Sequence, residues 1–162
     1  MEKTALTWLL GANSARGFHS LYEGFPPEGA FLRVIKGGPG TGKSSFMRRI
    51  AAAAEAAGLG VEYIICSGDP DSLDAILLPE KKTAIVDGTA PHVVEPTCPG
   101  AVERYVNLGD CYDRKGLKEL REELRNAMKG YKGCYARAYR CLDAAAEIAS
   151  DMRSLVVTPA VE

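Results

Sequence analysis

The chain has 162 residues, of which 46% are hydrophobic and 25% are charged, and its formal net charge is −1. These values are ordinary for one globular domain with a sizeable core. The near-neutral charge excludes the strong overall basic field of a nucleic-acid or membrane-surface protein, so neither partner is expected. Five cysteines without a C-x-x-C pair predict reduced thiols rather than a disulfide framework or a metal cluster.

Short apolar segments separated by turn residues fill the first 35 positions. Residues 4–11 and 17–22 can each form a strand, and residues 24–29, which include two prolines, predict a turn. Residues 31–35, F-L-R-V-I, predict a buried strand that leads into a glycine-rich loop.

That loop, G-G-P-G-T-G-K-S at residues 37–44, matches the phosphate-binding pattern G-x-x-x-x-G-K-[ST] at every position. The alanine-rich residues 45–57 that follow predict a helix, so the pattern stands between a strand and a helix, as its mechanism requires. Backbone N–H groups of the loop and the positive end of the helix would then face phosphate oxygens. The sequence therefore predicts a nucleotide-binding site.

The residues of this loop have different expected roles. We expect nucleotide contacts from Gly37, Gly38, Gly40, Thr41, Gly42, Lys43, Ser44 and Ser45. The glycines let the backbone curl around the β-phosphate. Lys43 would act in catalysis with its ammonium between the β- and γ-phosphates, and the Ser44 hydroxyl would join the Mg²⁺ shell. Ser45 would reach the α-phosphate.

The chain after this helix alternates between strand and helix signals. Gly58 is placed to end the helix, and residues 61–66 predict the next strand. This alternation predicts a parallel α/β sheet with right-handed crossovers. Residues 73–78 could form a short helix or an extended piece. Residues 90–99 contain three prolines and predict a surface loop.

Residues 83–87, T-A-I-V-D, fit a Walker B strand. The carboxylate that ends such a strand holds a Mg²⁺-bound water or the serine of the phosphate loop. Asp87 is therefore predicted to act in catalysis and, with Ser44, to hold the metal. In the alternative interpretation, Asp87 only caps the turn 87–89.

Gly88 stands where many ATP-hydrolysing motors carry a glutamate that activates water. Another group would have to orient the water, or the acceptor is not water. The candidate acidic or basic groups are Asp69, Asp71, His92 and Glu95. An arginine that completes the site could be Arg104, Arg114, Arg137 or Arg140. The sequence singles out none of them.

From Leu117 to Leu155 apolar residues recur at alternating steps of three and four, the spacing of a coiled-coil seam. The seam consists of Leu117, Leu120, Leu124, Ala127, Tyr131, Cys134, Ala138, Cys141, Ala145, Ile148, Met152 and Leu155. Gly130 and Gly133 weaken the helix and mark either a bend in a two-helix hairpin or a close-packing point. We expect a core at residues 1–115, a long helical segment at 116–155 that packs on or extends from it, and a tail at 156–162. The helical segment could bind a protein partner or a second copy.

Several strings make the chain resemble a family of bacterial P-loop ATPases best known from Firmicutes. They lie at residues 10–18 (L-G-A-N with G-F), 35–44 and 66–74, and further at 86–92, 99–103 and 107–110. Members of that family commonly carry two tandem P-loop halves, so the resemblance implies that this chain corresponds to the first half. It also implies ATP as the ligand and possible ATPase activity.

Taken together, the residues predict an α/β, three-layer P-loop NTPase with a mostly parallel sheet and a C-terminal helical extension or hairpin. ATP and Mg²⁺ are the expected cofactors, with ATP favoured over GTP because no [NT]-K-x-D string occurs. A cytoplasmic location is expected because the nucleotide is cytosolic. The expected activity is slow or partner-dependent ATP hydrolysis. The alternatives are a small-molecule or nucleoside kinase, for which no arginine-rich lid is visible, and a nucleotide-gated binding module without turnover.

Overall fold

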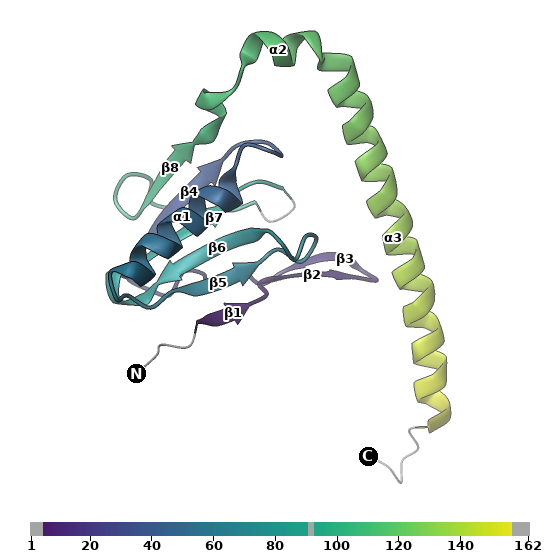
Figure 1. The fold of residues 1–162 in the computed structure, drawn as a ribbon. Coiled ribbons are helices and arrows are strands. Elements are labelled where there is room, and N and C mark those ends of the chain that lie inside the picture. Colours follow the sequence, from purple (N-terminus) through teal and green to yellow (C-terminus); the bar gives the residue numbers. More distant parts are fainter. Residues whose placement is uncertain (1–4, 91–92, 157–162) are drawn as a thin grey trace. The chain divides into compact units, whose positions relative to one another are not determined.

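The computed structural model describes residues 5–90 and 93–156 (Figure 1). The chain divides into two compact units. The sheet unit contains the chain up to Ala12 and Ser20–Tyr112, and the helical unit contains Asn13–His19 and the chain from Asp113 onward. Within the described ranges, no helix is both long enough and apolar enough to cross a membrane.

The sheet unit is built on six strands in the order β1-β5-β6-β7-β4-β8. Their bounds are β1 (Leu6–Trp8), β4 (Phe31–Lys36), β5 (Glu62–Ile65), β6 (Leu73–Leu78), β7 (Thr83–Asp87) and β8 (Glu103–Asn107). Five of the strands run in the same direction, whereas β6 is antiparallel to both of its neighbours. The prediction of a mostly parallel α/β sheet is therefore confirmed.

The strand β6 is the extended alternative expected for residues 73–78, and its antiparallel direction departs from the parallel crossovers that the strand–helix alternation predicts. Each of its six residues is buried, so the strand lacks the apolar–polar alternation by which a half-exposed strand is recognised. It returns directly from β5, so no helix intervenes. The edge strand β8 was not expected from the sequence, because only its pairing with β4 distinguishes it from the surrounding loop.

The helix α1 (Lys43–Ala56) covers one face of the sheet (Figure 1). Its residues Met47 and Ala51 are buried against Ile35 and Ile76. The helix ends where the sequence predicts, because Gly58 follows it with φ +78°. On the other face, loop residues cover a second apolar cluster, to which Tyr22, Leu32, Val34, Ala75, Leu77, Ala84 and Val86 belong.

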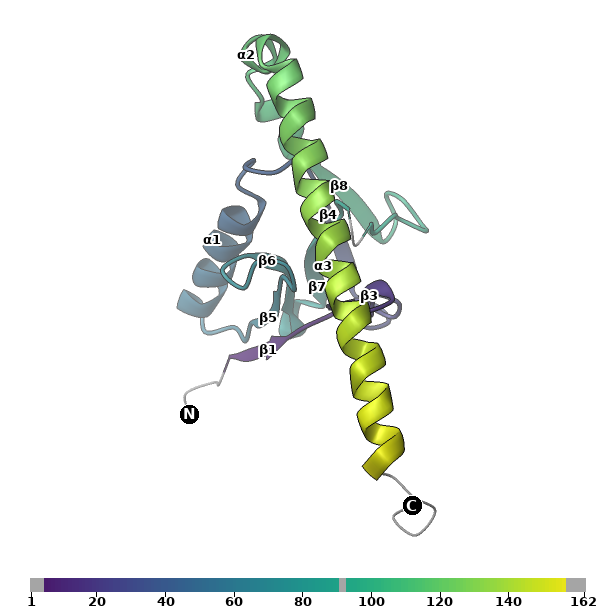
Figure 2. The ribbon, with the colours of Figure 1, turned by 90° about the vertical axis from the view of Figure 1, so that its right-hand side faces the viewer.

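In the helical unit, Asp113 caps the short helix α2 (Arg114–Glu119) by accepting hydrogen bonds from two backbone N–H groups. The helix α3 (Arg121–Val156) then runs for 36 residues without a break at Gly130 or Gly133 (Figure 2). Of the two alternatives for this region, the continuous helix is present and the two-helix hairpin is not. The strands β2 (Gly11–Ser14) and β3 (Gly17–Ser20) form a separate two-stranded sheet.

Candidate functional site

The carboxyl ends of the parallel strands meet at one edge of the sheet, where ligands bind in open α/β folds. The strand register places Ile35 of β4 beside Asp87 of β7, and Lys36 of β4 beside Asn107 of β8. The loops that follow β4, β5, β7 and β8 therefore begin at the same edge. The glycine-rich loop follows β4, and the predicted Walker B carboxylate, that of Asp87, ends β7, so both lie at this edge.

Residues 37–44, named the phosphate loop after their predicted ligand, connect the end of β4 to the first turn of α1. Gly40 and Gly42 have φ values of +77° and +81°, which lie in the left-handed region that favours glycine. The Lys43 side chain folds back over the loop, and its Nζ donates hydrogen bonds to the carbonyl oxygens of Gly37 and Gly38 at 2.9 and 3.0 Å. Thr41 Oγ1 donates to Gly38 O at 2.7 Å, so the Thr41 side chain braces the loop.

Asp87 faces the ammonium group of this lysine. Its Oδ2 lies 3.5 Å from Lys43 Nζ, and both side chains are almost completely buried. Its Oδ1 accepts hydrogen bonds from Thr89 N at 3.0 Å and from Thr89 Oγ1 at 2.6 Å. One oxygen of Asp87 therefore caps the turn, and the other lies beside the Lys43 ammonium group, so the turn is not the only partner of this carboxylate.

Ser44 lies in the first turn of α1 and is linked to β6. Its Oγ accepts a hydrogen bond from Leu73 N at 3.0 Å. The loop between β5 and β6 is attached to α1 as well, since the Arg48 side chain donates a hydrogen bond to Asp71 O at 2.7 Å. A hydroxyl group that accepts one hydrogen bond keeps its own proton and a second lone pair. The Ser44 hydroxyl can therefore still serve another partner.

The residue types at this edge fit Mg²⁺, which prefers hard oxygen ligands such as the Ser44 hydroxyl and the Asp87 carboxylate. Among the residues that the structure describes, no three His, Cys, Asp or Glu side chains come together as a metal site. Mg²⁺ commonly keeps several waters and takes one or two protein ligands together with substrate phosphates. The site thus fits a metal that arrives with a polyphosphate.

Gly88 approaches β4 too closely to carry a side chain. A Cβ added there would overlap Val34 Cγ1 and would lie 3.2 Å from Lys36 Nζ and from Val94 O. Val34 is completely buried, so it has little room to move aside. Packing therefore excludes a glutamate directly after Asp87.

Of the candidate acidic and basic groups, Glu95 is committed to another interaction. Its two oxygens contact Lys36 Nζ and the Tyr105 hydroxyl, each at 2.6 Å. The hydrogen bond from Lys36, followed by that from Tyr105, lowers the pKa of Glu95. Lys36 also donates to Gly88 O at 2.8 Å, so this network anchors the chain after β7.

The other candidates differ in position. Asp69 and Asp71 are exposed on the loop after β5, at the same edge as the phosphate loop. His92 lies outside the described residues. Arg104 pairs in register with Arg33, three positions before the end of β8, and is thus away from the edge. The remaining candidates, Arg114, Arg137 and Arg140, belong to the helical unit.

One residue at the phosphate loop had no signal in the sequence. Tyr112 follows the short 3₁₀ helix η2 (Leu108–Cys111), and its hydroxyl accepts a hydrogen bond from Gly38 N. A Cβ at Gly38 would meet this hydroxyl, so the close approach requires glycine. The two residues are 74 positions apart, and a lone tyrosine in a polar stretch does not indicate such a contact.

A cluster of polar side chains, formed by Tyr22, Asp74 and Cys66, lies near the same edge on the sheet face opposite α1. Burial raises the pKa of Tyr22, and the neighbouring Asp74 carboxylate raises it further. Burial likewise raises the pKa of the Cys66 thiol. Asp74 is itself buried and follows Leu73 at the irregular start of β6. No sequence pattern indicates this cluster, because its members are scattered along the chain.

The chain matches no model of a known protein family, and no curated protein or solved structure shows significant similarity to it.

Proposed function

We propose that the sheet unit binds Mg·ATP at residues 37–45 and hydrolyses it slowly or under the control of a partner. The observation that carries the proposal is the position of Lys43. Its ammonium group is held by the carbonyl groups of the loop, at the start of α1 and opposite the Asp87 carboxylate. A strand, a glycine-rich loop, a lysine and a helix start in this order form an anion site suited to a polyphosphate.

The residues of the site would then divide the work. Backbone N–H groups of the loop and of the first turn of α1 would bind the phosphates. Lys43 would stabilise the negative charge that develops on the transferred phosphoryl group. Ser44 and Asp87 would hold Mg²⁺ directly or through water, and the bound ion would neutralise charge between the β- and γ-phosphates.

Slow or partner-dependent turnover is inferred from Gly88. Packing against Val34 prevents a glutamate at this position, so the group that orients the attacking water has to come from elsewhere. The exposed carboxylates of Asp69 and Asp71 belong to a loop at the same edge of the sheet. A partner protein could also supply the missing group.

The same two carboxylates favour a small-molecule or nucleoside kinase as the second candidate. A carboxylate beside the transferred phosphoryl group can accept the proton of a substrate hydroxyl. ADP release measured with and without a panel of nucleosides and small alcohols separates the two functions. Turnover that depends strictly on one acceptor would replace the ATPase with a kinase.

Calorimetric titration with Mg·ATP, Mg·ADP and Mg·GTP tests the binding step. We expect saturable binding of Mg·ATP and weaker binding of Mg·GTP, since no guanine-reading string is present. Lys43→Arg is the control, because it keeps the charge but changes the geometry of the donor group. The proposal is wrong if none of the three nucleotides binds to the folded protein.

A further inference from the structure

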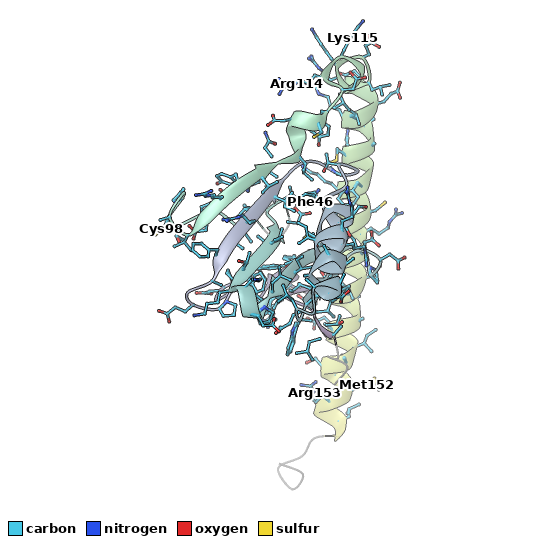
Figure 3. All side chains as sticks on the ribbon, turned by 60° about the vertical axis from the view of Figure 1, so that its left-hand side comes forward. Phe46, Cys98, Arg114, Lys115, Met152 and Arg153 are labelled. Carbon is cyan, nitrogen blue, oxygen red and sulfur yellow. The ribbon has the colours of Figure 1, made fainter. Side chains whose placement is uncertain are left out.

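The helix α3 presents an exposed apolar seam over its whole length. Ile148 and Met152 are each 62% exposed and Leu155 is 82% exposed. Figure 3 shows Met152, which belongs to the seam, and Arg153, which does not, projecting from different sides of the last turns. A helix of this length spans about 54 Å. Most helical stability in proteins comes from packing of an apolar face, so a seam of this length calls for a partner helix.

The contact between α3 and the β2–β3 hairpin leaves the seam open. Tyr139 Oη donates a hydrogen bond to Asn13 Oδ1 at 2.8 Å, and both residues belong to the helical unit. Tyr139 lies one position beyond Ala138 and is not part of the seam. Tyr135 and Tyr139 are half-buried, whereas the seam residues between Leu124 and Leu155 are exposed.

We propose that α3 pairs with α3 of a second copy of the chain as an antiparallel two-helix coiled coil. The seam residues occupy the a and d positions of the heptad, and the e and g positions flank them. Between Glu123 and Leu155, the e positions hold Met128, Tyr135, Leu142 and Ala149, and the g positions hold Glu123, Gly130, Arg137, Ala144 and Asp151. One flank of the seam is therefore apolar, and the other flank carries the charges.

The difference between the two flanks favours antiparallel over parallel pairing of the two helices. Parallel helices bring e residues against g residues, so Met128 would meet Glu123 and Leu142 would meet Arg137 of the second copy. Such contacts desolvate a charge against an apolar side chain. Antiparallel helices bring e against e and g against g, so the apolar flanks meet each other. On the polar side, Arg137 then faces Ala144 rather than a like charge.

One antiparallel register places every a residue opposite a d residue. The midpoint of this register lies between residues 139 and 140, because the two residue numbers of each paired layer then add up to the same value. The paired layers are Leu124 with Leu155, Ala127 with Met152, Tyr131 with Ile148, Cys134 with Ala145, and Ala138 with Cys141. Large side chains meet in the layers of Leu124 with Leu155 and Tyr131 with Ile148, whereas small side chains meet in the two central layers. The small central layers let the two backbones approach closely.

The oligomeric state of the full chain tests the pairing. We expect a dimer in sedimentation equilibrium, and we expect Ile148→Glu, which places a charge in the seam, to raise the dimer dissociation constant at least tenfold. Ala146→Glu adds the same charge at an outward position and should leave the dissociation constant unchanged. Circular dichroism verifies that both variants keep their helix. A monomeric parent chain, or an equal effect of the two variants, would overturn the proposal.

Lysine substitutions at the two glycines of α3 test the antiparallel orientation of the paired helices. A Cβ added at either Gly130 or Gly133 meets nothing within 4 Å, so lysine fits at both positions and raises helix propensity alike. In the antiparallel register, Gly130 faces Asp151 of the second copy, and Gly133 faces solvent. Gly130→Lys should therefore lower the dissociation constant about two- to fivefold more than Gly133→Lys does.

The advantage of Gly130→Lys should disappear at high salt and in an Asp151→Ala background, because both remove the ion pair. Equal dissociation constants for the two lysine variants at low salt would contradict the antiparallel register. An advantage of Gly130→Lys that persists in the Asp151→Ala background would contradict this register as well.

Discussion

Gly38 N–H donates a hydrogen bond to the Tyr112 hydroxyl, which joins the phosphate loop to the segment after β8. The carbonyl group of the same glycine accepts a hydrogen bond from Lys43 Nζ. Because this lysine is expected to reach the β- and γ-phosphates, Tyr112 is expected to lie beside the part of the loop nearest the terminal phosphate.

Tyr112→Phe should tighten Mg·ATP binding. The change keeps the ring but frees the Gly38 N–H for a phosphate oxygen, and one neutral hydrogen bond contributes about 0.5–1.5 kcal/mol, so we expect roughly a two- to tenfold lower Kd. Mg·ADP, which lacks the terminal phosphate, should be affected less. Calorimetric titration measures both constants, with Tyr63→Phe as a control for hydroxyl loss elsewhere in the sheet unit. Weaker Mg·ATP binding would instead mean that the Tyr112 hydroxyl itself contacts the nucleotide.

Lys43→Ala should weaken Mg·ATP binding by about 1.5–3 kcal/mol, because it removes a charge-assisted contact to the phosphates. It should also lower the free energy of unfolding of the ligand-free protein, since the almost completely buried Asp87 loses the cation 3.5 Å away. The double variant Lys43→Ala/Asp87→Asn removes both charges. It should recover stability without recovering binding, as thermal denaturation and titration would show. Recovered binding in the double variant would contradict the role given to Lys43.

Gly88→Ala should lower the free energy of unfolding by about 1–3 kcal/mol, because its Cβ would overlap the buried Val34. The matched control is Gly130→Ala, where a Cβ meets nothing within 4 Å and alanine improves helix propensity. In chemical denaturation, the free energy of unfolding should therefore fall for Gly88→Ala and rise for Gly130→Ala. A neutral Gly88→Ala would mean that the chain after Asp87 relaxes easily and that packing does not exclude a glutamate there.

Glu103 should make the stability of the sheet unit depend on acid pH. Burial raises the pKa of its carboxyl group, but hydrogen bonds from Cys98 N and Thr97 Oγ1, at 2.9 and 3.0 Å, lower it so that the net pKa lies below the usual value. A lowered pKa contributes stability above the unfolded-state pKa of about 4.3, and this stability is lost as the pH falls through the folded-state pKa.

The corresponding variant is Glu103→Gln. It should melt at a lower temperature than the parent chain at pH 7, and the difference should shrink below about pH 4. Thermal denaturation across this range measures the effect. A difference that stays constant from pH 7 to pH 3 would show that the carboxylate charge at position 103 has no part in it.

The sequence by itself determined the strand, loop and helix at residues 31–57 and the strand that ends at Asp87. These elements depend on local features: an apolar run, glycines at positive φ, and a helical apolar face. The same local reasoning anticipated that Lys43 and Asp87 would belong to one site, because the ends of parallel strands share an edge of the sheet.

Only the tertiary structure decided the direction of β6, the pairing of β8 with β4, and the contact between Tyr112 and Gly38. It also revealed why residue 88 is glycine, since the atom that excludes a side chain belongs to Val34 on another strand. The physical reason is the same in each case. Periodicity and propensity describe neighbours along the chain, whereas strand pairing and close approach depend on the positions of residues distant in sequence.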